Sequence, residues 1–177
     1  MSQQQTCEQM SRRKLFQRLF VNKETVLNEI NQQKFKRKVA RPPSSVDETL
    51  LAKLCDGCRQ CESACQQRVL KLVNGKPELH LDCNFCTHCG DCAKVCNTGA
   101  LANSSQSTGV APIFTDQCQR LLYGQCEICK INCSQNAIST EEKRPTLHQE
   151  HCNGCGECRI HCPMNAISLE LIDISQQ

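Results

Sequence analysis

The sequence of 177 residues is poor in the side chains that usually fill a protein interior, with no tryptophan, one tyrosine and five phenylalanines. It also lacks any stretch approaching the roughly 20 apolar residues that a membrane-spanning helix needs. The polar first nine residues are not followed by the apolar run of a secretory signal peptide. We therefore expect neither an integral membrane protein nor a secreted one, and a core that depends on something other than aromatic packing.

Cysteine is the residue that the sequence has in excess, at 18 of 177 positions. Disulfides rarely persist in the reducing compartment that the missing export signal implies, so a disulfide framework is not expected. The cysteines are predicted to be metal ligands or reactive thiols.

Charge is distributed unevenly along the chain. Residues 1–43 hold ten basic and three acidic side chains, a net charge of +7, whereas residues 44–177 have a net charge of −4. Between them, the Arg41-Pro42-Pro43-Ser44-Ser45 segment has the composition of a stiff, non-helical linker. We predict a basic N-terminal arm and linker (1–43) followed by a cysteine-rich body (44–177).

The body contains four cysteine units, spanning about residues 46–75, 76–105, 110–140 and 143–172. Three have the spacing C-x2-C-x2-C-x3-C, and the third unit along the chain has C-x7-C-x2-C-x3-C. The candidate ligands are Cys55, Cys58, Cys61 and Cys65 in the first unit, Cys86, Cys89, Cys92 and Cys96 in the second, Cys118, Cys126, Cys129 and Cys133 in the third, and Cys152, Cys155, Cys158 and Cys162 in the fourth.

Short apolar segments recur around these units. An apolar pair follows each fourth cysteine, and residues 77–81, 112–114 and 145–147 carry alternating apolar side chains that predict strands. The sequence therefore predicts an α+β fold of tandem ferredoxin-like repeats. Each repeat is expected to contain a strand, a cysteine loop, a short helix carrying the fourth cysteine, and a second strand.

The spacing of the cysteines indicates iron–sulfur chemistry. Three cysteines at intervals of three residues can converge from one loop onto a compact cluster, and this is the spacing of bacterial ferredoxins, whose fourth cysteine ligates the other cluster of a pair. Structural zinc sites prefer two separated pairs of cysteines, so zinc is the weaker alternative. We predict [4Fe–4S] clusters, four if the third unit is complete. Neighbouring units could pair, one with two and three with four, or the pairing could be nested, one with four and two with three.

Several residues leave alternatives open. Cys118 is either a ligand or the remnant of a degenerate unit, and the insert after it, residues 119–125, could fold back over a cluster. Cys7 and Cys83 fall outside the units and are expected not to be ligands. The histidines are expected to be solvated, although most lie beside cysteine loops, where a side chain could donate to a cluster sulfur; they are His80, His88, His148, His151 and His161.

The order of the units, with the stretched gap in the third, resembles the NapF family of ferredoxin-type accessory proteins of periplasmic nitrate reductase systems. The resemblance covers about residues 11–172 and includes Ser11-Arg12-Arg13, the Arg41-Pro42-Pro43 segment and the Cys-Asn-Gly-Cys-Gly-x-Cys loop at 152–158. It implies a cytoplasmic iron–sulfur protein that binds the precursor of the molybdenum-containing catalytic subunit, with the N-terminal arm as the contact. Such a protein would help that subunit to acquire or reduce its own cluster before export.

A general ferredoxin-type electron carrier, or an electron-transfer subunit of an oxidoreductase, is the alternative function. No glycine-rich nucleotide loop or nucleophile–base pair predicts an enzyme, and no nucleic-acid-binding fold accompanies the basic residues 34–38. Ser11-Arg12-Arg13 also resembles a twin-arginine export signal, but no apolar run follows it, so export is not expected.

Overall fold

The computed structural model describes residues 37–104 and 106–172. The chain divides into two compact units, Met1–Lys34 and Phe35–Gln177, and every described residue belongs to the second. Residues 1–36 of the predicted basic arm lie outside the described residues, so the fold presented here is that of the body.

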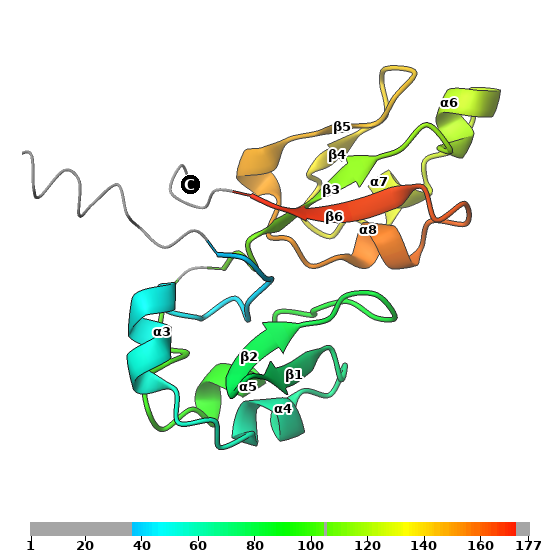
Figure 1. Cartoon of the computed structure of the whole chain (residues 1–177). Helices are drawn as coiled ribbons and strands as arrows, with labels where there is room; N and C mark the ends of the chain where they lie inside the picture. Colours follow the sequence, from blue (N-terminus) through cyan, green and yellow to red (C-terminus); the bar gives the residue numbers. More distant parts are fainter. Residues whose placement is uncertain (1–36, 105, 173–177) are drawn as a thin grey trace, which may run out of the picture. The chain divides into compact units, whose positions relative to one another are not determined.

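Short helices alternate with short antiparallel strands in the body, which has the mixed α+β content predicted from the cysteine units (Figure 1). In chain order the elements are α3 (Glu48–Leu54), α4 (Gln60–Ala64), β1 (Leu70–Val73), β2 (Lys76–Leu79), α5 (Asp91–Lys94), β3 (Val110–Phe114), α6 (Gln119–Tyr123), α7 (Ile128–Ile131), β4 (Ile138–Ser139), β5 (Thr146–Leu147), the 3-10 turn η1 (Gln149–His151), α8 (Glu157–Ile160) and β6 (Ile167–Leu171).

The strands of the described residues form two-stranded antiparallel sheets. β1 and β2 make a hairpin that turns at Asn74 and Gly75, whose φ angles of 51° and 74° are those that a type I′ turn requires. β4 pairs with β5, and β3 pairs with β6 from Val110↔Leu171 to Phe114↔Ile167. The last pairing places the beginning and the end of residues 110–171 side by side (Figure 1).

The three predicted strand segments lie where the sequence places them, on β2, β3 and β5. The apolar pair after the second unit differs, because Ala100 and Leu101 lie in a turn. The Ala100 carbonyl accepts from the backbone N–H of Val46 (3.2 Å), and Asn103 N–H donates to the Ser44 carbonyl (2.9 Å). This short pairing takes the place that β3–β6 has in the later part of the body.

The short helices carry the third cysteine of each unit, which corrects the prediction that they carry the fourth. Each helix ends before the fourth cysteine, whose N–H donates to the carbonyl three residues earlier, as Cys65 does to Glu62 (3.2 Å). The chain cannot continue as a helix because the third residue after each fourth cysteine has a positive φ, at Arg68, Gly99, Asn136 and Asn165.

Residues 40–46 are non-helical as predicted, but they pack within the body and do not form a linker. The Arg41 side chain, only 7% exposed, donates two hydrogen bonds to the Glu48 carboxylate (2.9 and 2.8 Å) and one to the Pro77 carbonyl (2.8 Å). The Ala40 carbonyl accepts from Leu79 N–H (2.9 Å). The folded body therefore begins before Arg41, because a guanidinium this deeply buried requires the partners that α3 and β2 supply.

The buried residues form two small groups, and cysteines belong to both. One gathers Val69, Leu70, Leu79, Leu81, Leu101 and Val110 around Cys61, and the other joins Ile138 and Ile167 to Cys129 and Cys158. The apolar core is thus thin, and the cysteine loops complete it. Within the described residues, no helix has the length and apolar character needed to cross a bilayer.

Candidate iron–sulfur sites

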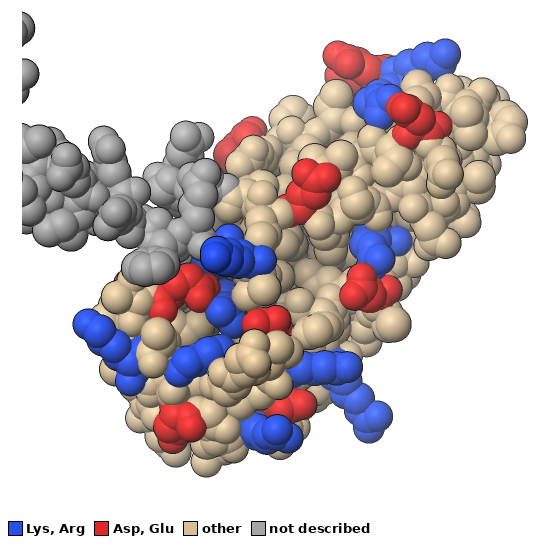
Figure 2. Space-filling model, viewed as in Figure 1, with Lys and Arg blue, Asp and Glu red and all other residues tan. Residues whose placement is uncertain are grey.

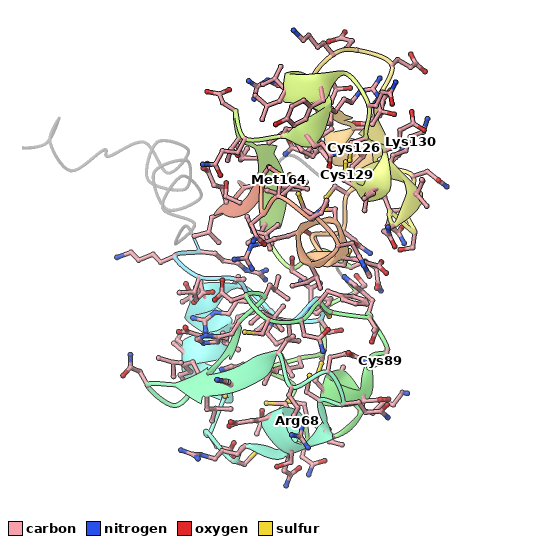
Figure 3. All side chains as sticks on the ribbon, turned by 90° about the vertical axis from the view of Figure 1, so that its right-hand side faces the viewer. Arg68, Cys89, Cys126, Cys129, Lys130 and Met164 are labelled. Carbon is pink, nitrogen blue, oxygen red and sulfur yellow. The ribbon has the colours of Figure 1, made fainter. Side chains whose placement is uncertain are left out.

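All sixteen predicted cysteines line one of four cavities, with four cysteines around each. Figure 3 shows Cys126 and Cys129 of one cavity, with Met164 of the same lining, and Cys89 of another. We name the cavities by their cysteines: site I (Cys55, Cys58, Cys61, Cys96), site II (Cys65, Cys86, Cys89, Cys92), site III (Cys118, Cys126, Cys129, Cys162) and site IV (Cys133, Cys152, Cys155, Cys158).

Each site takes three cysteines from one unit and its fourth from the neighbouring unit. Cys96 completes site I and Cys65 completes site II, while Cys162 and Cys133 are exchanged in the same way between sites III and IV. The exchange accompanies the packing of α4 against α5 and of α7 against α8, the helices that carry the third cysteines of the paired units. Of the two pairings that the spacing left open, the structure has the neighbouring one.

The donor set fits an iron–sulfur cluster better than a single metal ion. Four thiolates are the ligands of a [4Fe–4S] cubane, in which each thiolate binds a different iron and the sulfurs stand apart around the cluster. Among the described residues, no group of three or more His, Cys, Asp or Glu side chains is arranged to hold one ion. The cysteines instead surround a space, which is the arrangement that a cubane requires.

Cys118 lies where the interpretation of the third unit as complete predicts it, in the lining of a cavity with three other cysteines. Cys118 is buried, precedes α6 and lines site III with Cys126 and Cys129. The insert does not fold back over the cavity with its large side chains, because Leu122 and Tyr123 are 54% and 73% exposed. The longer gap accommodates one extra turn of helix that ends at Gly124.

Backbone turns shape the cysteine loops. Asp56 and Asn153 accept hydrogen bonds from the N–H of Cys58 (3.1 Å) and Cys155 (3.2 Å), closing equivalent turns at sites I and IV. Gly154 follows Asn153 with a φ of 71°, and a Cβ added there would overlap the Thr108 hydroxyl and the Val110 carbonyl. Only glycine allows this loop to approach the segment before β3 so closely.

Burial dominates the electrostatics of the cysteines. It raises the pKa of Cys61, Cys86, Cys92 and Cys129 to about 11, and that of Cys158 to about 12. Neighbouring thiols add to the effect on Cys158, first Cys155 and Cys152, and then Cys133. These groups are protonated in the cluster-free chain at neutral pH, so that binding of iron must displace protons.

Three of the fourth cysteines, Cys96, Cys133 and Cys162, have hydrogen-bond donors close to their sulfurs. The N–H groups of Ala137 and Ala166 donate to the sulfurs of Cys133 and Cys162, both at 3.3 Å. At Cys96, burial alone would raise the pKa, but hydrogen bonds from the Thr98 hydroxyl and from nearby backbone N–H groups outweigh it and lower the pKa. Such donors stabilise negative charge on sulfur. The same arrangement accounts for the first residue of the apolar pair that follows a fourth cysteine. In three units this residue is an alanine buried beside the sulfur, at Ala100, Ala137 and Ala166, each 1% exposed.

Sites II and IV are joined directly through the backbone. The N–H of Cys86 donates to the carbonyl of Cys155 at 2.9 Å. The Arg159 side chain donates to the Leu81 carbonyl (2.7 Å) and pairs with Asp82 (3.1 Å) close by. The loops of the two sites are therefore held at a fixed separation.

Of the remaining described cysteines and histidines, one lines a four-cysteine cavity and the others do not. Cys83 is exposed and lines none of the four cavities, and Cys7 lies outside the described residues. His80, His148, His151 and His161 are exposed, and the ring of His161 lies 6.2 Å from that of Phe85. His88 differs from them because it lines site II, and it is the residue that a comparison of the four loops could have singled out in the sequence.

Comparison with known families agrees with these sites. Residues 54–100 match the 4Fe-4S dicluster domain family, and residues 145–168 match the 4Fe-4S binding domain family. The first match contains every cysteine of sites I and II, and the second contains Cys152, Cys155, Cys158 and Cys162. The chain is thus a 4Fe–4S-binding protein of the ferredoxin type.

Three similar proteins indicate which ferredoxin-type proteins the chain is related to. It is 32% identical over 145 residues to the ferredoxin-type protein NapG of Escherichia coli (strain K12) and to that of Shigella flexneri, with 66% of this chain aligned, and it spans 63% of the length of those relatives. It is 36% identical over 119 residues to an uncharacterized protein of Haemophilus influenzae, with 67% of this chain and 70% of the relative covered. These named relatives are NapG proteins, so the comparisons support a relation to NapG and do not support NapF specifically. The chain belongs to the same family as the Haemophilus influenzae protein, among the ferredoxin-type 4Fe–4S proteins.

Proposed function

We propose that the chain is an electron-transfer protein that holds four [4Fe–4S] clusters, one in each of sites I to IV, with the sixteen cysteines named above as ligands. The observation that carries the proposal is the set of four cavities with four cysteines each. When bound, such clusters supply one-electron transfer.

The sites follow one another in the order I, II, IV, III. Cys92 of site II contributes electrostatically to the raised pKa of Cys61 in site I. The backbone N–H of Cys86 in site II donates to the carbonyl of Cys155 in site IV. Cys129 of site III contributes electrostatically to the raised pKa of Cys158 in site IV. Four structural sites serving stability alone would not need to form an uninterrupted row. This continuity favours electron transfer.

The finer role that we propose is that of an accessory protein in the cytoplasm. It would bind the precursor of the periplasmic nitrate reductase catalytic subunit and support assembly or reduction of that subunit's iron–sulfur cluster before export. The resemblance to the NapF family supports this role, and so does the basic arm. Acidic and basic side chains are interspersed on the face of the body in Figure 2, so the excess of basic residues in 1–34, six basic against three acidic, is the more distinctive docking feature.

A general electron carrier, or an electron-transfer subunit of an oxidoreductase, is the second candidate. The similarity to the ferredoxin-type NapG proteins favours it equally, since their name specifies a ferredoxin type and no maturation role. Residues 1–34 discriminate between the candidates, because a freely diffusing carrier does not need a basic extension before its folded body.

The test is an anaerobic pull-down of the tagged, cluster-loaded protein from nitrate-respiring cells, with and without residues 1–34. The truncation must stop there, because Arg41 belongs to the fold of the body and Pro42 to Ser44 line site II. Recovery of the unexported molybdenum subunit by the full chain and not by the truncated one supports the accessory role. Recovery of only reductase partners, equally by both, supports the carrier.

A further inference from the structure

His88 occupies a backbone position at which equivalent loops have glycine. The residue before the second cysteine of the loop is Gly57 at site I and Gly154 at site IV, and their φ angles are 75° and 71°. His88 stands at the same position of site II, with a φ of 54°. Residues with a side chain rarely adopt this conformation, whereas glycine adopts it without strain. The backbone of His88 is therefore in a conformation that its side chain disfavours.

The two ring nitrogens of His88 are buried and have no hydrogen-bond partner among the residues that the structure describes. Neither Nδ1 nor Nε2 is paired with any described residue, although both atoms are buried. An imidazole carries at least one N–H donor in any protonation state, and a buried donor without an acceptor is unfavourable. His88 lines the same cavity as Cys65, Cys86, Cys89 and Cys92. An acceptor in that cavity would satisfy it.

We propose that the His88 ring N–H donates a hydrogen bond to a sulfur of the [4Fe–4S] cluster at site II and thereby raises the reduction potential of that cluster relative to the others. The inference rests on the proposed occupancy of site II. A hydrogen bond to sulfur stabilises the more negative, reduced state, so its presence raises the potential. His88 is a positioning residue in this sense, because it acts on the cluster and is not a ligand.

The other sites cannot make this contact from the same position. Gly57 and Gly154 have no side chain, and the corresponding residue of site III, Gln125, is exposed and is not among the residues that line that cavity. Site II therefore differs from the other sites in having a side-chain donor at this position. It is also the site whose backbone is hydrogen-bonded to site IV.

The test compares the anaerobically loaded wild-type chain with two variants. His88→Gly installs the residue that sites I and IV already use, so the loop is expected to keep its shape. His88→Phe keeps a ring but removes the N–H. The control, His80→Asn, changes an exposed histidine that lines no cavity. Iron and sulfide are counted, each potential is measured by redox titration with electron paramagnetic resonance, and Fe–S stretching frequencies are recorded in H₂O and D₂O by resonance Raman spectroscopy.

We expect all three variants to keep the wild-type iron content. One cluster should have a lower potential in both His88 variants, with loss of its deuterium-sensitive Fe–S shift, and the His80 variant should match the wild type. The affected cluster should be the one that Cys89→Ala removes.

Three results would overturn the inference, and each can be distinguished from the others. Full iron content with all potentials unchanged in both His88 variants excludes the hydrogen bond while leaving the proposed function intact. Loss of one cluster in His88→Gly would show a role in holding the cluster and would exclude tuning. A Cys89→Ala variant with wild-type iron content would show that site II holds no cluster, and both the occupancy and the inference would fail together.

Discussion

The backbone N–H of Cys86 lies 2.9 Å from the carbonyl oxygen of Cys155, and this hydrogen bond connects two cysteine loops that are separated by almost seventy residues of sequence. It is supported from the Cys155 side by Thr108, whose hydroxyl donates to the Gly154 carbonyl at 2.7 Å. The contact between sites II and IV therefore depends on the close approach of the Gly154 loop to the segment before β3.

Gly154→Ala should disrupt this approach. The added methyl would overlap the Thr108 hydroxyl and the Val110 carbonyl. The positive φ of this position would destabilise the alanine variant by a further amount of about 1–2 kcal/mol. Gly90→Ala is the matched control, since Gly90 has a φ of 77° and open space around its Cβ position. We expect Gly154→Ala to lower the midpoint for thermal loss of the visible cluster absorbance well beyond Gly90→Ala. Equal midpoints would show that the loop can shift without cost.

The iron content of double cysteine variants tests which sites exchange their fourth cysteines. Cys58→Ala and Cys96→Ala should each remove one cluster, about four iron per chain, and together they should remove no more, because both residues line site I. Cys58→Ala with Cys65→Ala should remove about eight, because Cys65 lines site II. Anaerobic iron analysis gives the counts. Nested pairing would instead make Cys58 and Cys162 the pair whose effects do not add.

The third unit gives a separate prediction. Cys118→Ala should lower the iron content by about four per chain, because buried Cys118 lines site III. Cys83→Ala should leave it unchanged, because Cys83 is exposed and outside the four cavities. A wild-type count of about 12 iron, unaffected by Cys118→Ala, would mean that site III does not hold a cluster.

Arg41→Ala should destabilise the loaded body by about 3 kcal/mol, the typical loss when one partner of a buried ion pair is removed. The change leaves the Glu48 carboxylate and the Pro77 carbonyl without the donors that Arg41 supplies. Urea unfolding followed by loss of visible absorbance measures the effect. Lys94→Ala is the control, because its ion pair with Asp91 lies at the surface and should contribute little. A midpoint equal to that of the control would assign residues 40–46 to a dispensable linker after all.

Removing the iron should unfold the body. The two groups of buried residues are small and include cysteines that line the sites, so little apolar packing remains once the clusters are gone. Anaerobic chelation followed by circular dichroism should show loss of the helical signal together with the cluster absorbance. A cooperative unfolding transition in the iron-free chain would contradict this expectation.

Local sequence pattern was sufficient for much of this architecture. The spacing of the cysteines identified every cysteine that lines the four cavities, and alternating apolar residues located β2, β3 and β5. The spacing predicted that fourth cysteines are exchanged within pairs of units. It could not predict that Cys65 and Cys96 are the exchanged pair, because neighbouring and nested pairings have identical local spacing and differ only in which helices pack together. The burial of Arg41 was missed for a similar reason, since its partners Glu48 and Pro77 are defined by tertiary contacts.

Two signals were present in the sequence but were not used. Asn74-Gly75 between two short apolar segments is typical of a type I′ hairpin turn. The replacement of glycine by His88 becomes evident when the loops are aligned, although its consequence requires knowing that the ring nitrogens are buried.

The exchanged cysteines also constrain the timing of cofactor insertion during synthesis. A site needs all four ligands, so sites I and II can be completed once the ribosome has released the chain through Cys96. Site III receives its last ligand only when Cys162 emerges, 44 residues after Cys118 and close to the end of the body. Site IV has Cys133 early but waits for Cys158. The first pair of clusters can therefore be inserted into a nascent chain, whereas the second pair must wait until translation of the body is nearly finished.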